Sequence, residues 1–364
     1  SKNAFDSNDC MHSEQAEGEQ AEGEQAGRRH SEQADGKQAE GWYAGVRVRM
    51  ALTVRTAFTA SKRRVGNYSA GYLVKISLRT PLFKASIMVS IVPTIEGMFK
   101  QKLCRPLIYG ETNYRPDHIP SGPVQNVPAP KFVKFLNPED LFGIARKILP
   151  LYATNTPLQE RMPQDEASLC IATEADVAAI ARLSLLHPVN IAATAALIKK
   201  NGRLECRQER TVGTTRPDTT WVYVDSKNNE KTIAILEYKN TSILRRSDFD
   251  QAEVSTPVEA IDMMKWLNKA NKDTKLEHNA RSVSKQAKNY SQKGGTPDVA
   301  VFDWKSMVIY DFSMVSETLG SPAPTLLTWF SETGTNYVDS GNMKTFRALL
   351  LGFLLRALKR HGLA

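Results

Sequence analysis

Apolar positions along the chain predict alternating helices and strands from about residue 131 onward. Apolar side chains recur at steps of three and four in three early segments, which predicts helices over 138–148, 174–186 and 189–200. Runs rich in β-branched and aromatic residues then predict strands over 204–212, 219–225 and 231–240. The turn-rich residues 226–229 join the last two of these strands, so we expect a β-hairpin there.

Helices and strands are also expected after the hairpin. Thr256, Pro257 and Glu259 form a capping box with proline at the first helical position, so a helix should begin there and run through Trp266. A second helix should end at Gly294, because its apolar face stops before the pair of glycines. That face comprises Leu276, Ala280, Val283, Ala287 and Tyr290.

The last part of the pattern predicts two more strands, over 299–304 and 307–312, and a final helix. The helix is indicated by an apolar stripe made of Phe346, Leu349, Leu350, Phe353, Leu354 and Ala357. Helices thus alternate with strands, which predicts an α/β fold in residues 131–364.

Residues 1–130 do not show such a pattern. An imperfect five-residue repeat begins with Glu-Gln-Ala-Glu-Gly at 14–18 and 19–23 and continues to residue 41. A period of five matches neither a helix nor a strand, and each unit carries a helix-breaking glycine. We therefore expect a disordered low-complexity arm, formed by the acidic repeat, a basic stretch and a proline-rich linker over 119–130.

The net charge of +9 is distributed unevenly along the chain, and the most basic stretch lies within this arm. Residues 1–41 carry four Lys/Arg and ten Asp/Glu, whereas residues 42–105 carry twelve Lys/Arg and one acid, Glu96. The basic stretch contains Lys62, Arg63 and Arg64, which indicates either a solvated arm or a nuclear-localising, polyanion-binding tail. The overall charge is therefore weak support for nucleic-acid binding by the folded part.

Membrane, zinc and disulfide signals are absent from the sequence pattern. The longest uncharged run of residues 42–105, at 85–95, includes Pro93 and is well short of the ~20 residues that a bilayer needs. The four cysteines show no Cys-x-x-Cys spacing, and the six histidines are scattered. We expect an intracellular protein of the nucleus or cytoplasm that does not enter a membrane.

Candidate chemistry lies at the open end of the hairpin, in Asp218, Glu237 and Lys239. Glu237 and Lys239 are alternate residues of one strand and share a face, with Ile233 and Ile235 predicted on the same side. Antiparallel pairing brings Asp218, which follows Pro217, toward them. Two carboxylates and a lysine suit Mg²⁺-assisted phosphodiester cleavage. The alternative is a surface ion pair on an edge strand, with Asp218 as a turn residue.

The combination of these residues with later segments resembles the PD-(D/E)XK nuclease-like superfamily, in particular fungal proteins of uncharacterised function that carry such a domain. The resemblance covers about 189–312. It rests on Arg216-Pro217-Asp218, Glu237-Tyr238-Lys239, and the segments 285–290, 296–304 and 307–312. It implies a restriction-endonuclease-like core, with a mixed central β-sheet flanked by helices.

The resemblance also implies roles for individual residues. Asp218 and Glu237 would bind Mg²⁺ or Mn²⁺, Lys239 would be the catalytic lysine, and Gln286 would contact the lysine or the substrate phosphate. Some branches add an acid from the preceding helix, but 189–200 contains none, so Glu209 is the nearest substitute as a metal ligand. Gln286 alternatively is a solvated residue, and Tyr290 fits a core position better than a catalytic one.

Three functions follow from the sequence. The first is Mg²⁺-dependent phosphodiester hydrolysis of DNA or RNA. The second is a catalytically inactive nuclease fold that serves nucleic-acid or protein interaction, and the third is an accessory domain of a larger fungal protein. The oligomeric state is not indicated. Cations near the site would favour the first function; the candidates are Arg207, Arg210, Arg245, Arg246, Lys285 and Lys288.

Overall fold

The fold is that of a computed structural model. It describes residues 94–104, 106–108, 116–117, 124, 126–162, 169–197, 201–211, 214–314, 323–332 and 343–364. The chain divides into two compact units, 1–64 and 65–364, and the first lies wholly outside the described residues. The acidic repeat and most of the basic stretch, which the sequence predicts to be disordered, therefore lie outside them as well.

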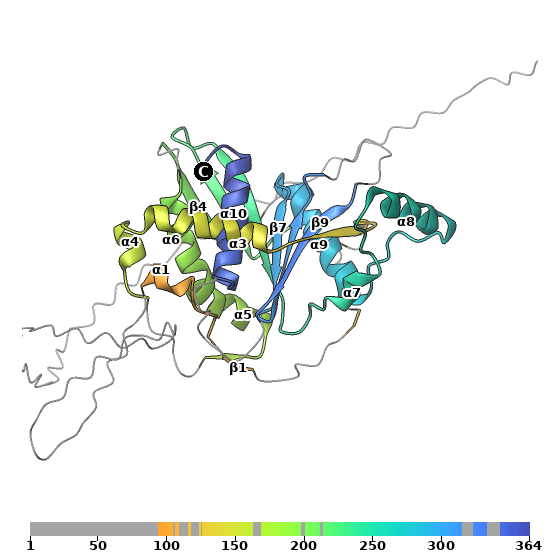
Figure 1. The fold of residues 1–364 in the computed structure, drawn as a ribbon, viewed down its shortest axis with the longest axis horizontal. Coiled ribbons are helices and arrows are strands. Elements are labelled where there is room, and N and C mark those ends of the chain that lie inside the picture. The colour runs from red at the N-terminus through yellow and green to blue at the C-terminus, as the bar shows by residue number, and fades with distance from the viewer. Residues whose placement is uncertain are drawn as a thin grey trace, which may run out of the picture. The chain divides into compact units, whose positions relative to one another are not determined.

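A seven-stranded mixed sheet forms the centre of the second unit, in the order β2-β9-β8-β7-β6-β5-β4 (Figure 1). Strands β4, β5 and β6 form an antiparallel meander, and β7 then pairs parallel to β6. The strands are β2 Val133–Leu136, β4 Arg203–Gln208, β5 Thr219–Val224, β6 Glu230–Tyr238, β7 Asp298–Phe302, β8 Ser306–Asp311 and β9 Thr325–Ser331. The mixed α/β architecture is thus confirmed.

Two of the seven strands, β2 and β9, are not predicted by the sequence pattern. The two strands pair in parallel with each other, with Val133 opposite Thr325. They are therefore separated along the chain by almost the whole length of the domain. Strand β2 has only four residues and directly follows a proline-rich segment, so the sequence there is typical of a linker and not of a strand. A smaller parallel pair, β1 Leu107–Ile108 with β3 Cys170–Ile171, stands apart from the main sheet.

Helices cover both faces of the sheet. Figure 1 shows α3, α6 and α10 on one side and α7 and α9 on the other. The helices are α1 Ile95–Met98, α3 Glu139–Ile148, α4 Thr156–Gln159, α5 Glu174–Ala181, α6 His187–Ala195, α7 Ser247–Asp250, α8 Pro257–Lys269, α9 His278–Gly294 and α10 Phe346–Arg360. A 3₁₀ turn, Leu149–Tyr152, follows α3.

Each face of the sheet contributes to a separate buried cluster. Leu236 and Phe302 pack with α10 on one face, whereas Ile235 and Tyr310 pack with α9 on the other. The sequence pattern places Ile233 on the same face as Ile235, and this prediction is wrong. Ile233 is an extra residue in β6, because Trp221 pairs with Ala234 and the next pair skips to Thr232. The bulge turns Ile233 toward the cluster that contains Leu236.

The predicted helix boundaries after the hairpin are confirmed. The Thr256 hydroxyl accepts a hydrogen bond from the Glu259 backbone N–H at 3.2 Å and starts α8, which continues past Trp266. Gly295 ends α9 with a left-handed backbone of φ +62°, which a side chain would strain. The final helix begins at Phe346, after a Thr345 cap.

The sequence pattern predicts two separate helices over 174–186 and 189–200, and this prediction is wrong. Helices α5 and α6 are joined by a π-helical segment, Arg182–Leu186, into one run that continues through Pro188. Proline has no N–H, so the Ser184 carbonyl loses its usual donor four residues on. The Arg347 Nε, from α10, donates to that carbonyl at 2.5 Å instead. A tertiary contact thereby supplies a donor to this carbonyl at the point where the run passes the proline.

Arg347→Met is expected to lower the free energy of unfolding by about 3 kcal/mol. The arginine is fully buried, so its loss leaves backbone acceptors without a donor. Equilibrium urea denaturation would measure the change, with Arg203→Met, at a side chain 60% exposed, as the matched control. Equal stability of the two variants would contradict the prediction. The acceptors are the carbonyls of Met98, Gln101, Lys102 and Ser184.

The same run, Glu174–Ala195, is long and apolar enough to cross a membrane, by length and composition. Within the described residues it is the one helix that meets this condition, and 56% of its most apolar window is buried inside the fold. A core helix meets the same condition, so the run is weak evidence for a membrane span.

The folded unit begins earlier than the predicted boundary at residue 131. The sequence assigns 94–104 to the disordered arm, but Ile95 and Phe99 are buried in the cluster that contains α10. The Thr345 hydroxyl donates to the Phe99 carbonyl at 3.0 Å, which ties this segment to the start of α10. For 94–104 the predicted disorder is therefore wrong, because its apolar residues have a partner far away in the sequence.

Candidate functional site

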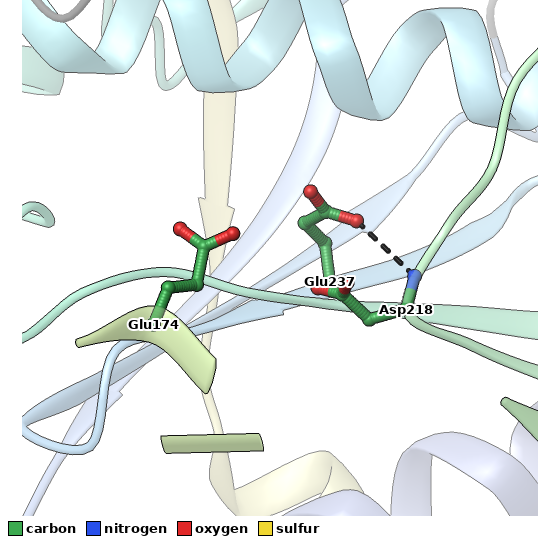
Figure 2. Close-up of side chains that lie close together, drawn as sticks. All are labelled: Glu174, Asp218 and Glu237. Carbon is green, nitrogen blue, oxygen red and sulfur yellow. Dashed lines mark hydrogen bonds between the residues drawn. The ribbon is translucent and has the colours of Figure 1, made fainter. Parts of the chain in front are cut away.

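Hairpin β5–β6 brings Asp218 and Glu237 together. Thr219 pairs with Leu236, so the residue before β5 lies beside the end of β6. The Tyr238 backbone N–H donates to Asp218 Oδ2 at 2.7 Å, and the Asp218 N–H donates to Glu237 Oε2 at 3.4 Å (Figure 2). Asp218 is thereby held at the open end of the hairpin, where the sequence pattern predicts it.

Lys239 continues from β6 into the same group. Its backbone N–H donates to the Phe302 carbonyl at 2.9 Å, which extends the parallel pairing of β6 with β7. Its Nζ lies 2.7 Å from Glu237 Oε1 and 3.5 Å from Glu174 Oε1. The side chains of Glu237 and Lys239 are only 5% and 7% exposed, so they do not form a surface ion pair on an edge strand. Central β6 has neighbours on both sides.

Glu174 is the third carboxylate of the group, and the sequence pattern does not predict it. Oxygen atoms of Glu174, Asp218 and Glu237 all lie within 4.8 Å of one another, in a group that could hold a metal ion (Figure 2). Glu174 is the first residue of α5. The preceding Thr173 caps this helix reciprocally with Asp176, whose carboxylate accepts from the Thr173 backbone N–H at 2.8 Å.

Glu174 is not predicted from the sequence for a clear reason. Splitting the helical run at Pro188 makes 189–200 the helix before the first strand, and that segment contains no acid. In the structure the helix before β4 begins at Glu174 and includes it. The capping box of Thr173 with Asp176 marks this start in the sequence, and it would identify Glu174 once the run is followed through the proline.

Glu209, the predicted third ligand, does not join the group. It follows β4 with a left-handed backbone of φ +49°, and its side chain is 63% exposed and paired with Arg216. Its backbone N–H donates to the Asp218 carbonyl at 2.8 Å, so its backbone, and not its carboxylate, contacts the site. Strand β4 ends at Gln208, before the expected 212, so Glu209 lies outside the strand.

Gln286 reaches the site from α9. Its Nε2 donates to Glu237 Oε1 at 2.7 Å and to the Tyr290 hydroxyl at 2.8 Å. The contact predicted from the resemblance was with the lysine or a phosphate, whereas the structure shows one with Glu237. Tyr290 is 6% exposed and packs in the α9 cluster, and its hydroxyl hydrogen-bonds both Gln286 and the Glu237 carboxylate. Gln286 therefore fixes the orientation of the Glu237 carboxylate.

The electrostatics of the group show an excess of negative charge. Burial, followed by the neighbouring Glu237 carboxylate, raises the pKa of Asp218 to about 7, although the Tyr238 N–H and Lys239 oppose the shift. Burial disfavours the charged form of Lys239, but Glu237, Glu174 and Asp218 together raise the pKa of its ammonium. Lys239 is accordingly a cation at neutral pH and does not act as a base here.

Ionisation of all three carboxylates leaves two negative charges that Lys239 does not neutralise. A divalent cation has the charge that would balance them. The donor set is entirely oxygen, which suits Mg²⁺ or Mn²⁺ better than softer metals. Glu174 is 44% exposed, so one side of the group is open to water and to a ligand. Glu174, Asp218 and Glu237 thus fit a site for such a cation.

Three of the predicted phosphate-binding cations are paired with carboxylates. Arg207 and Arg210 both contact Glu230 at 2.6 Å, and Arg246 contacts Asp250 and Glu253 at 2.7 Å each. These ion pairs reduce the positive charge that the three arginines offer to a phosphate. Lys285 and Lys288 lie half-buried on α9, the helix that carries Gln286.

Comparison with protein-family models, curated proteins and solved structures gives no match. The assignment of the candidate site is therefore based on the geometry and charge of this chain alone.

Proposed function

We propose that the protein is a metal-dependent phosphodiesterase that acts on DNA or RNA. The observation that carries this proposal is the grouping of three carboxylates beside one ammonium group, which leaves two negative charges once all three carboxylates are ionised. The arrangement of Asp218, Glu237 and Lys239 on adjacent strands supports it. The proposed core is restriction-endonuclease-like, as the resemblance to the PD-(D/E)XK superfamily implies, and the mixed sheet flanked by helices agrees with that proposal.

Each residue has a part in the proposed reaction. Glu174, Asp218 and Glu237 would hold Mg²⁺ or Mn²⁺, which when bound polarises a phosphodiester and acidifies water. Lys239 would stabilise the negative charge that develops on the phosphate, because its raised pKa keeps it a cation at neutral pH. Gln286 would hold Glu237 in one orientation through its hydrogen bond. Burial of Glu237 and Lys239 strengthens these charge interactions.

A catalytically inactive nuclease fold is the second candidate. The observation in its favour is the 2.7 Å contact between Lys239 and Glu237, which partly neutralises the carboxylates without a metal. Cleavage of supercoiled plasmid and of labelled RNA, with Mg²⁺, with Mn²⁺ and with EDTA, distinguishes the two candidates. We expect metal-dependent cleavage that Lys239→Met reduces by about a hundredfold or more. Wild-type protein that cleaves neither substrate with either metal would contradict the proposed function.

Stability of the metal-free protein is expected to fall as pH rises from about 5 to 8. The folded state raises the pKa of Asp218 from 3.8 to about 7, so it holds this proton more tightly than the unfolded chain does. Between these values the folded state binds more protons, and each rise in pH therefore disfavours it. Added Mg²⁺ should stabilise the protein more at pH 8 than at pH 5, because it binds the ionised carboxylates.

Thermal unfolding with EDTA and with Mg²⁺ measures this effect. Burial also raises the pKa of Asp303 to about 7, so the readout is the difference between wild type and Asp218→Asn. We expect the melting temperature of Asp218→Asn to fall less steeply with pH in EDTA, and to respond less to Mg²⁺. The same pH slope in both proteins would show that Asp218 does not titrate in this window.

A further inference from the structure

A groove leads away from the carboxylate group between the helical run and the end of β4. One wall carries Ala175, Ala178, Ala179 and Arg182, and the facing wall carries Gln208 and Glu209. Glu174 and Asp218 line the same groove, so it is continuous with the candidate site. Its volume is about 350 Å³, within the range of roughly 300–1,000 Å³ that is typical of ligand pockets.

The helical wall is shaped by the spacing of its residues. Glu174, Ala178 and Arg182 are four residues apart and therefore lie along one face of the run. Eight residues of helix place the Arg182 backbone about 12 Å from that of Glu174. Only methyl groups line the wall between these two charged residues, which leaves the groove open along its length.

Arg182 differs from the other arginines near the site. Residue Arg182 is exposed, and among the described residues its charge acts on the Cys206 thiol and the Tyr238 hydroxyl, whereas no carboxylate forms an ion pair with it. Across the groove, the charge of Glu209 is matched by Arg216. Arg207 and Arg210, at the same edge of the sheet, share Glu230. Arg182 is thus the groove's arginine whose guanidinium is available for an anion.

We propose that this groove holds the nucleic-acid strand beside the scissile bond, and that Arg182 binds a neighbouring phosphate of that strand. The inference rests on the proposed function and specifies its substrate as a polynucleotide, in which the scissile phosphate has neighbours. A guanidinium is suited to bidentate contact with phosphate oxygens. Arg182 is two helical turns beyond Glu174 and is not part of the carboxylate group, so we assign it to substrate binding and not to the chemistry.

Substrates with and without neighbouring phosphates test the inference. A dinucleotide has a single phosphodiester, whereas a labelled 12-mer of DNA or RNA supplies neighbours on both sides. Arg182→Ala should lower kcat/KM on the 12-mer about tenfold, mostly through KM, and at least fivefold more than on the dinucleotide. Arg203→Ala is the matched control, because this exposed arginine lies on β4 outside the groove. We expect it to behave as wild type.

Binding provides a second arm that does not depend on turnover. In EDTA, the affinity for a fluorescent single-stranded 12-mer should depend less steeply on salt in Arg182→Ala than in wild type. Loss of one phosphate contact lowers the slope of log K against log[salt] by about 0.7 for single strands. Arg203→Ala should retain the wild-type slope.

The outcomes separate the inference from the proposed function. If wild type cleaves neither substrate, the proposed function fails, and an unchanged salt slope in Arg182→Ala would then overturn the inference as well. If Glu237→Gln is inactive but Arg182→Ala loses equal activity on both substrates, or none on either, the function stands and the groove does not bind the flanking strand.

Discussion

Glu237→Gln is expected to reduce Mg²⁺-dependent cleavage of supercoiled plasmid or labelled RNA by about a thousandfold. Glu237 has four partners in the site: Lys239 and Gln286 contact its Oε1, the Asp218 N–H contacts its Oε2, and the Tyr290 hydroxyl hydrogen-bonds its carboxylate. An amide of the same shape removes one of the charges that would hold the cation. It also replaces one acceptor oxygen by a donor, in a position where every neighbour donates.

The control for this variant is Asp262→Asn, which makes the same chemical change on α8. Asp262 is 64% exposed, and its ion pair is with Lys265, three residues along the same helix. Initial rates at saturating metal, together with metal titrations, separate loss of cation affinity from loss of turnover. Activity in Glu237→Gln close to that of Asp262→Asn would mean that the cleavage comes from another site.

Glu174→Gln is expected to reduce cleavage by about tenfold to a hundredfold, less than Glu237→Gln. Glu174 is half-exposed and lies 3.5 Å from the lysine ammonium, so water can replace part of its contribution. This result would assign the third carboxylate to the start of α5. The sequence pattern assigns it to Glu209 instead.

Glu209→Gln is the matched comparison for Glu174→Gln, because each variant converts a solvent-accessible glutamate near Asp218 to its amide. The Glu209 side chain is paired with Arg216 and lies outside the carboxylate group. We expect Glu174→Gln to lose at least five times more activity than Glu209→Gln, measured at several Mg²⁺ concentrations. A larger loss in Glu209→Gln would restore the assignment made from the sequence.

Local signals explain the parts of the fold that the sequence predicts well. The turn at 226–229 and the alternation of β6 from Ile235 to its end are short-range features, and they place Asp218 opposite Glu237 without reference to the rest of the chain. The start of α8 and the end of α9 likewise depend on Thr256 and Gly295, which act on their own backbone. Predictions of this kind succeed because the residues that decide the structure are neighbours in the sequence.

Long-range contacts explain the parts that it misses. Strand β2 becomes a strand by pairing with β9, and segment 94–104 is ordered against α10. The helical run crosses Pro188 through a π-helical segment, and Arg347, more than 150 residues away, donates to the Ser184 carbonyl there. None of these partners is visible in a local window, since each is brought near only by folding.

The sequence by itself determined the α/β class and the hairpin that joins Asp218, Glu237 and Lys239, because periodicity and turn residues act locally. The tertiary structure alone decided that Glu174, and not Glu209, completes the carboxylate group. It also placed Gln286 against Glu237 and opened the groove toward Arg182. The reason is physical: a site assembled from α5, β5, β6 and α9 depends on how these elements pack, and packing follows from contacts across the whole domain.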